Sequence, residues 1–321
     1  MSRIALPARA LPAVLAALLV AVLAACGRAP APVAAPAPSA PAPPAPSTHA
    51  PAPTADPRCP DPAWSCEQQQ RFAAAAAHAR RAAGPQGHLA AVLVDRTTGA
   101  TWRTGDTARP GWTASTIKLA IAADLLARDR AGTIGLTAAD RRDLAGMLNS
   151  SDEAASDRLW KAYGGADMLD RFRTRFGMTT LRFVPGFTPR PYWGFVKCST
   201  DDLAHLAEHV LTATDPADRA QLVAALRGVA PNQRWGVWAA GAAERPGNKD
   251  GWSFEADPGG RHWVTATVGF AGPDERYVVA VSDQLDPAGT LPQGVHAVSD
   301  LVALLFGRPV PAPVTVPAPD G

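Results

Sequence analysis

The chain has 321 residues, a formal net charge of +2 at pH 7 and a hydrophobic content of 47%. This near-neutral charge gives no sign of a nucleic-acid partner or of a general affinity for acidic lipids. Between its two Pro-rich ends the chain is long enough to bury one sizeable core, in one or two lobes. We therefore expect one globular domain, monomeric and without a nucleic-acid partner.

The first 26 residues combine a positively charged start, an apolar run and a cysteine. Arg3 and Arg9 precede an apolar run at 11–25, which has the length of a secretory signal and is short for a membrane span. The run ends in Leu-Ala-Ala-Cys, which resembles the lipobox of bacterial lipoproteins, whose cysteine is acylated and becomes the new N-terminus. The resemblance implies a signal peptide over 1–25 and a lipid on Cys26. A plain signal peptide or a short anchor is the alternative.

Residues 26–57 are almost wholly Pro and Ala and are expected to form a linker. This composition cannot build a core, and repeated Pro favours extended polyproline II. At about 3 Å per residue, the linker would be a semi-rigid stalk of up to roughly 90 Å. It would hold a domain at 58–308 away from the cell membrane, facing the cell wall or periplasm. The Pro-rich tail at 309–321 is expected to be disordered.

Three cysteines remain besides the lipidated one. Cys59 and Cys66 flank a six-residue loop and could form a local disulfide in an exported protein. Cys198 would then be free and buried, unless it pairs with one of the other two. The sequence leaves this pairing open.

Strand patterns occur at both ends of the domain, and helical patterns fill its middle. A helix at 67–83 and two strands within 88–106 come first, and they are followed by helices at 117–128, 140–148, 153–163, 166–176, 200–211 and 218–227. Strands at 248–254, 262–271 and 276–284 and a helix at 294–305 complete the domain. This order predicts an α+β fold, with one antiparallel sheet flanked by the terminal helices and a separate all-helical lobe.

Ser115 and Lys118 form the pattern S-x-x-K near the start of the helix at 117–128. Residues three apart share one face of a helix, and a helix N-terminus favours a developing negative charge. A partly desolvated lysine has a lowered pKa, so it can act as the base that a serine nucleophile needs. The same pair also occurs by chance in the first turn of ordinary helices.

Two later segments offer complementary chemistry. Ser151, Asp152 and Glu153 begin a helix, where the serine hydroxyl could relay a proton and Asp152 could cap the helix. Lys249, Asp250, Gly251 and Trp252 enter a late strand, where a lysine could bind a substrate carboxylate and a glycine permits close approach. Taken singly, the first segment is explained by capping and the second by a turn.

Together, and in this order, the three segments resemble the penicillin-recognising serine hydrolases, which are the serine β-lactamases and D,D-peptidases. Their motifs are S-x-x-K, S-D-N and K-T-G or relatives of these. The run SDEAASDRLW at 151–160 resembles the S-D-N helix of the family, with its usual Ala-Ala and apolar pair. The run PNQRWGV at 231–237, followed by KDGW at 249–252, resembles exported actinobacterial relatives of class A β-lactamases. The similarity covers about 67–307 and implies a β-lactamase/D,D-peptidase-like fold.

The resemblance also implies an acyl-transfer site that needs no cofactor. Ser115 matches the acylated nucleophile, Lys118 the base and Ser151 the proton relay. The backbone N–H groups of Ser115 and Trp252 match the two donors to the oxyanion. The substrate implied is a β-lactam or a peptidoglycan-type D-Ala amide or ester. The positions that match the substrate-binding site are Glu153, Lys249, Asp250, Gly251 and Trp252.

The sequence departs from the family pattern at three places. Glu153 stands where the family has Asn, and an ionised carboxylate would pair with Lys118 and hold it protonated. Asp250 replaces Thr or Ser beside Lys249, and its charge would disfavour a substrate carboxylate. Residues 183–200 contain no Asp or Glu, whereas class A β-lactamases carry there the glutamate that activates the deacylating water. We therefore expect slow or absent turnover of β-lactams, and a catalytically inactive binding or scaffold module is the alternative.

Two short patterns suggest other chemistries. His205, Glu208 and His209 match H-x-x-E-H, an inverted zinc-peptidase motif. Both histidines fall opposite the apolar face of their helix, which is typical of a solvated surface, so no metal is expected. Cys198 could suggest a cysteine transpeptidase, but no local pattern supports it, and a small buried residue is expected instead.

Overall fold

The computed structural model of the chain describes residues 59–319. The predicted signal peptide at 1–25, the lipidated Cys26 and the linker at 26–57 lie outside this range. Residues 59–319 fall within one compact unit of the chain. No helix in this range is both long enough and apolar enough to cross a membrane.

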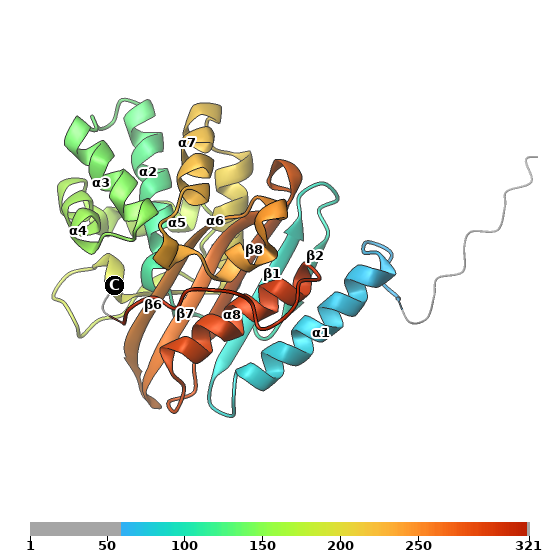
Figure 1. The fold of residues 1–321 in the computed structure, drawn as a ribbon. Helices are drawn as coiled ribbons and strands as arrows, with labels where there is room; N and C mark the ends of the chain where they lie inside the picture. Colours follow the sequence, from blue (N-terminus) through green and yellow to red (C-terminus); the bar gives the residue numbers. More distant parts are fainter. Residues whose placement is uncertain (1–58, 320–321) are drawn as a thin grey trace, which may run out of the picture. The chain divides into compact units, whose positions relative to one another are not determined.

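The two ends of the domain build one five-stranded antiparallel sheet (Figure 1). Its strand order is β2-β1-β8-β7-β6, and β1 pairs with β8 over its whole length, from His88 opposite Gln284 to Asp95 opposite Tyr277. The strands are β1 (His88–Asp95), β2 (Thr101–Thr104), β6 (Gly247–Asp257), β7 (Gly260–Ala271) and β8 (Tyr277–Gln284). The predicted sheet formed from both ends of the domain is therefore confirmed.

Eight α-helices occur in the described part of the chain. They are α1 (Cys66–Ala82), α2 (Lys118–Arg130), α3 (Ala138–Asn149), α4 (Glu153–Ala162), α5 (Gly165–Arg175), α6 (Thr200–Thr212), α7 (Pro216–Arg227) and α8 (Leu291–Leu305). Helices α1, α3, α6 and α8 each begin at a capping box, in which a Ser or Thr side chain and the third helical residue bond to each other's backbone N–H. All eight coincide with predicted helices to within a few residues.

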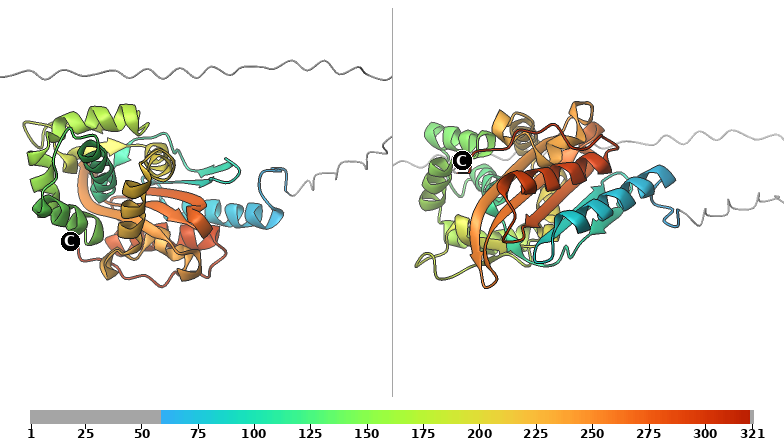
Figure 2. Two further views of the ribbon diagram at one scale, coloured as in Figure 1. Left: turned by 90° about the horizontal axis from the view of Figure 1, so that it is seen from above. Right: turned by 60° about the horizontal axis from the view of Figure 1, so that its bottom comes forward.

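Alternate residues of the central strands β1 and β8 face two different hydrophobic cores. On one face of the sheet, Leu93 and Val281 pack with α1 and α8. On the other face, Val92 and Ala280 pack with the helices of the middle of the chain. Figure 2 shows α1 and α8 side by side across one face, with the other helices beyond the opposite face. The predicted α+β architecture with a helical lobe is confirmed.

A second, smaller sheet was not predicted. It has the order β3-β5-β4 and consists of β3 (Gly111–Trp112), β4 (Arg182–Phe183) and β5 (Val196–Cys198). Strands of two or three residues are too short to carry a recognisable alternation. This sheet joins the segment before the S-x-x-K motif to both ends of the long loop that contains most of residues 183–200.

The prediction of a disordered tail is wrong for residues 309–319. Ala312 is buried, and its backbone N–H donates to Asp300 Oδ1 at 2.6 Å. Val314 and Val316 pack against the core on the α1/α8 side of the sheet. The proline-rich composition does keep the tail extended, but in an extended chain these alternate residues point to the same side. Their apolar side chains therefore bind the tail to the domain.

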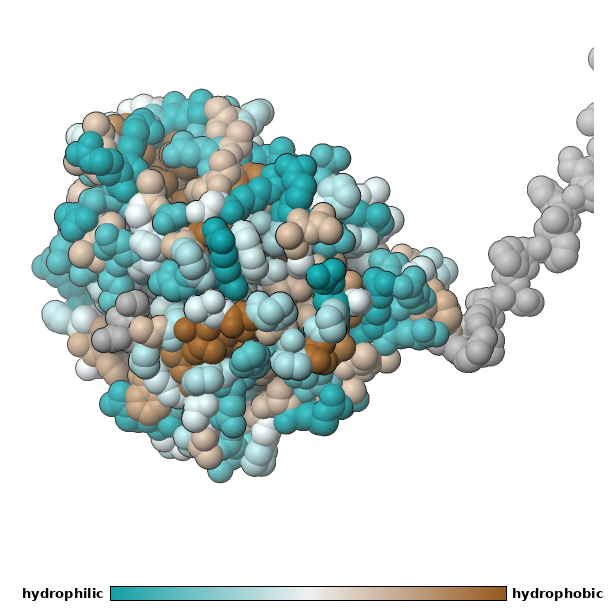
Figure 3. All heavy atoms as spheres, in the orientation of Figure 1, coloured by the Kyte–Doolittle hydropathy of each residue, from teal (hydrophilic) through white to brown (hydrophobic). Residues whose placement is uncertain are grey.

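The surface of the domain carries few large apolar side chains. In the described residues, only Phe187, Phe254 and Val310 are large hydrophobic residues that are exposed. The face drawn in Figure 3 is mainly hydrophilic, with small hydrophobic patches between polar residues. This face offers no broad apolar surface for a partner.

Candidate active site

The S-x-x-K motif lies at the edge of the large sheet, where β6 meets the helical lobe. Ser115 belongs to a 3₁₀ turn, η1 (Ala114–Ile117), which leads directly into α2. Ser115 borders a cavity of about 670 Å³, and Ser151, Glu153, Trp252 and Ser253 also line it. The structure thus brings residues of all three predicted motifs to one cavity.

The backbone around Ser115 leaves no room for a side chain on the facing strand. A Cβ atom on Gly251 would lie 2.5 Å from Ser115 N and 2.9 Å from Thr116 N. The preceding Ala114 has φ = 44°, a left-handed conformation that costs a non-glycine residue roughly 1–3 kcal/mol. The fold therefore holds the Ser115 N–H close against the β6 backbone, beside Trp252. This is the place where the family resemblance expects the oxyanion donors.

Ser151 lies between two buried lysines. Lys118 Nζ donates to Ser151 O at 2.7 Å and to Ser151 Oγ at 3.1 Å, and Lys249 Nζ donates to the same Oγ at 3.0 Å. A hydroxyl that accepts from two amines keeps its own hydrogen free to donate. Ser151 also has a left-handed φ of 65°. The Lys118 amine therefore bonds to Ser151 rather than to Ser115.

Burial controls the charge of both lysines. Lys118 is 0% exposed, and desolvation lowers the pKa of its amine to about 8, although the carboxylates of Glu153, Asp152 and Asp157 act in the opposite direction. Lys249 is also 0% exposed, and burial, followed by the charge of Lys118, lowers its pKa well below the usual value. A neutral amine next to Ser151 is therefore accessible near neutral pH.

The expected ion pair between Glu153 and Lys118 does not form, so that prediction is wrong. Glu153 is exposed to solvent at the start of α4, and the hydrogen bonds of Lys118 go to Ser151. Asp152 caps the helix by accepting from Ala155 N at 2.9 Å, as predicted. The left-handed turn at Ser151 and this cap present the Ser151 carbonyl and hydroxyl, rather than the glutamate, to the lysine.

The prediction that Asp250 would place a negative charge against a substrate is also wrong. Asp250 is fully buried, and its Oδ1 accepts from Thr267 Oγ1 at 2.6 Å on the neighbouring strand. Desolvation raises the pKa of this carboxyl to about 8. Asp250 does not line the cavity, so its carboxylate does not face a substrate bound there.

Lys249 lies deeper than its expected role suggests. Its Nζ donates to Asp250 O at 2.7 Å, lies 3.5 Å from Gln233 Oε1, and reaches the cavity only through Ser151. Gln233 is buried, and its carbonyl accepts from Asn248 Nδ2 at 2.9 Å. Neither Gln233 nor Asn248 was predicted as a site residue. Gln233 does lie in the run PNQRWGV, and Asn248 directly precedes Lys249, so the family resemblance already pointed to both segments.

The loop in which the family resemblance expects a carboxylate places an aromatic ring against Lys118. Lys118 Nζ lies 4.6 Å from the centre of the Trp193 ring, a cation–π distance. Asp157 fixes this ring by accepting from Trp193 Nε1 at 2.9 Å and from Tyr192 Oη at 2.7 Å. Neither Trp193 nor Asp157 was predicted as a site residue. The loop at 183–200 thus supplies an apolar surface to the site.

The alternative chemistries find no support in the structure. His205 Nδ1 lies 3.2 Å from Gly177 O, and the His209 ring packs 4.7 Å from that of Phe176. Within residues 59–319, no three His, Cys, Asp or Glu residues come together as metal ligands. Cys198 is free and buried, and burial raises its pKa well above the usual value, which opposes a role as nucleophile. Cys59 and Cys66 form a disulfide.

Comparison with known sequences finds relatives among mycobacterial lipoproteins. No model of a known protein family matches the chain. The chain is 31% identical over 209 residues to "Putative lipoprotein LppW" of Mycobacterium tuberculosis and of Mycobacterium bovis. The match covers 62% of this chain and 64% of each relative, so it spans less than two thirds of their length. The name of these relatives agrees with the lipoprotein form predicted from the N-terminal sequence.

Comparison with solved structures identifies the fold. A β-lactamase from Xanthomonas campestris pv. campestris matches with a TM-score of 0.60 at 19% identity, over 75% of this chain and 98% of that one. A β-lactamase from Burkholderia vietnamiensis gives 0.59 at 20%, over 75% and 95%. An ancestral class A β-lactamase gives 0.58 at 21%, over 74% and 99%. The described domain therefore has the class A β-lactamase fold, and the predicted likeness in fold is confirmed.

Proposed function

We propose that this β-lactamase-like domain is a serine hydrolase of the cell envelope. Its Ser115 forms an acyl-enzyme with a β-lactam or with a D-Ala-type amide or ester, and it releases the acyl group slowly. The observation that carries the proposal is the Ser151 hydroxyl held between two buried lysines, beside Ser115 and the close β6 backbone. Such an arrangement provides a base, a proton donor and a site for an oxyanion within one cavity.

In the proposed reaction, a neutral Lys118 amine takes the proton of the Ser115 hydroxyl. The Ser115 oxygen then bonds to the substrate carbonyl carbon, and the carbonyl oxygen gains negative charge beside the N–H groups of Ser115 and Trp252. Each such donor is typically worth about 3 kcal/mol of barrier. The Ser151 hydroxyl passes a proton to the leaving nitrogen or oxygen, and the protonated Lys118 restores it. Lys249 acts on a substrate carboxylate through Ser151, because its own amine is buried.

Slow release of the acyl group follows from the side chains around the cavity. The carboxylates that line it are Asp152 and Glu153, and Asp152 already caps α4. The loop at 183–200 contributes the Trp193 ring and no acid. Hydrolysis of an ester on Ser115 requires an activated water, and Glu153 is the remaining candidate to activate it.

A binding module without turnover is the second candidate function. It is favoured by Lys118, which in this state donates to Ser151 and makes no hydrogen bond to Ser115. It is also favoured by the tail, since Pro319 lines the same cavity and Ala318 O accepts from Trp252 Nε1 at 2.9 Å. In either case we propose a lipid anchor on Cys26 and a peptidoglycan-type or small-molecule ligand outside the membrane.

Intact-mass spectrometry after incubation with several β-lactams and an acyl-D-Ala ester tests the proposal. The wild-type domain should gain the mass of one acyl group and keep it over many minutes. Ser115→Ala should gain none, whereas Ser150→Ala, which removes an exposed hydroxyl on the same cavity, should still be acylated. An adduct that persists in Ser115→Ala contradicts the proposed nucleophile. Ligand binding without any adduct supports the binding module.

A further inference from the structure

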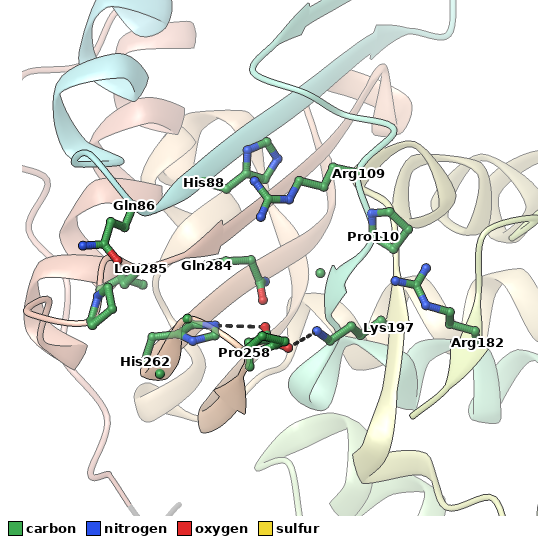
Figure 4. A pocket seen from close by; sticks show the side chains of 15 residues that line it. Gln86, His88, Arg109, Pro110, Arg182, Lys197, Pro258, His262, Gln284 and Leu285 are labelled. Atoms are coloured by element: carbon green, nitrogen blue, oxygen red, sulfur yellow. Dashed lines mark hydrogen bonds and ion pairs between the residues drawn. The ribbon is translucent and has the colours of Figure 1, made fainter. Parts of the chain in front are cut away.

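A second cavity, of about 450 Å³, lies at the end of the large sheet where β6 turns into β7. It shares no lining residue with the Ser115 cavity. Its polar side chains come from separate parts of the fold, namely His88 on β1, Arg109 before β3, Arg182 on β4, Lys197 on β5 and His262 on β7 (Figure 4). Its volume lies within the usual range of small-molecule sites, roughly 300–1,000 Å³.

The charge of this cavity is unbalanced. Arg109, Arg182 and Lys197 carry three positive charges, and Asp257 is the only acidic residue in the lining, so the net charge is 3 − 1 = +2 with neutral histidines. Asp257 is already engaged, because its carboxylate accepts from Lys197 Nζ and from Trp112 Nε1. The two guanidinium groups are therefore left without a counter-charge in the lining.

Neither Arg109 nor Arg182 bonds to another side chain or to a carbonyl through its guanidinium group within residues 59–319. Many other arginines of the domain are paired with carboxylates, as in Arg130–Asp218, Arg158–Asp143, Arg171–Asp124 and Arg276–Asp95. Guanidinium groups present fixed pairs of donors that match the oxygens of phosphate and carboxylate groups. Arg109 and Arg182 are both exposed, so their guanidinium groups are open to an anion that enters the cavity from solvent.

A buried histidine gives a second, independent indication of a ligand. His262 is 7% exposed, and its Nε2 has no hydrogen-bond partner, with the nearest acidic atom, Asp257 Oδ2, 3.7 Å away. A buried polar nitrogen without a partner is costly unless something bonds to it. On the other side of the cavity, His88 has a lowered pKa, first because of burial and also because of the positive charge of Arg109. His88 Nε2 lies 2.9 Å from Asp106 O, so His262 is the histidine of this cavity whose ring nitrogen is left without a partner.

We propose that this cavity binds a phosphate monoester of about the size of a sugar phosphate. A monoester phosphate carries a charge of about −1.5 to −2 at pH 7, which matches the excess of the lining, whereas a single carboxylate would leave one charge unbalanced. The phosphate lies between Arg109 and Arg182, and the organic part lies toward His262 and Gln284. The volume is larger than a bare phosphate ion requires, which favours an ester.

Isothermal titration of the domain with glucose 6-phosphate, inorganic phosphate and glucose tests this site. Glucose 6-phosphate should bind at one site in the millimolar range or tighter, more tightly than inorganic phosphate, and glucose should not bind. Arg109→Gln and Arg182→Gln should each weaken binding by about tenfold or more, as expected for a lost charge-assisted bond. Arg142→Gln is the matched control, because Arg142 is an exposed arginine of α3 outside the cavity.

Histidine NMR locates the bound ligand. The resonances of the His262 ring should shift on titration with glucose 6-phosphate, and they should not shift in the Arg109→Gln/Arg182→Gln double variant. Three results would overturn the proposal: no saturable binding, equal binding by wild type and the double variant, or binding that leaves His262 unchanged. Inorganic phosphate that binds as tightly as the ester would overturn the assignment of an ester.

Discussion

Lys118 should titrate near pH 8 in the folded domain, and its neutral form should control acylation of Ser115. Burial lowers the pKa of this amine from 10.5 to about 8. At about 1.4 kcal/mol per pH unit, this difference corresponds to about 3 kcal/mol. The neutral fraction at pH 7 then rises from about 0.03% to about 9%, a gain of roughly 300-fold in the form that can accept a proton.

The composition of the chain allows the pKa of Lys118 to be measured directly by NMR. The chain contains only four lysines, at positions 118, 161, 197 and 249. Domain labelled with ¹³C at the lysine ε-carbons should therefore show four resonances, each assigned by one Lys→Arg variant. In parallel, the rate of labelling by a fluorescent penicillin should increase about tenfold between pH 6 and pH 7 and level off above pH 8.

A substitution in the cavity sharpens the test. The Glu153 carboxylate raises the pKa of Lys118 against the effect of burial, so Glu153→Gln should lower it further. Both the NMR midpoint and the midpoint of the labelling profile should then move to lower pH. Glu208→Gln, which removes a carboxylate on α6, should move neither. A Lys118 midpoint near 10.5, or a shift of the Glu153→Gln profile to higher pH, would refute this reasoning.

Three further predictions follow from the site. Lys118→Met should raise the free energy of unfolding by about 2 kcal/mol at pH 7, because removal of the buried charge gains about 3 kcal/mol and loss of the hydrogen bonds to Ser151 costs about 1 kcal/mol. Because the folded-state pKa lies below the unfolded one, this gain should be full below pH 8 and decrease toward pH 10.5 in urea unfolding. Gly251→Ala should slow labelling of Ser115 by about 100-fold or more, because its Cβ would displace the Ser115 N–H; circular dichroism checks that the fold is kept. Deletion of residues 309–321 should speed labelling, and Trp252→Phe, which lacks the donor to Ala318, should reproduce part of that effect. An unchanged rate in the deletion variant would show that the tail does not restrict the cavity.

The sequence predicts the framework of the fold because the framework depends on patterns that are local and repeated. Helices α3, α6 and α8 have both an apolar face and a capping box, so their boundaries could be predicted to within a few residues. The strands that form the large sheet carry β-rich runs bounded by turn residues. The grouping of Ser115, Ser151 and the segment at 249–252 followed from their order and from the family resemblance, and the structure brings all three to one cavity.

The parts that were predicted wrongly depend on the exact course of the backbone. The pairing of Lys118 was decided by the left-handed conformation of Ser151, which turns its own carbonyl toward the lysine and leaves Glu153 in solvent. The position of Asp250 was decided by its cross-strand neighbour Thr267. The contact between the Trp193 ring and Lys118 depends on the loop at 183–200, whose sequence has no helical or strand periodicity. Residue types alone do not specify any of these conformations.

The course of the tail has a practical consequence for work with this protein. The described chain ends at Pro319, which lines the Ser115 cavity. An affinity tag or reporter joined after Gly321 would begin two residues from a wall of that cavity, where it can compete with a ligand. Recombinant protein for the assays above should therefore carry its tag before residue 59 and none after Gly321.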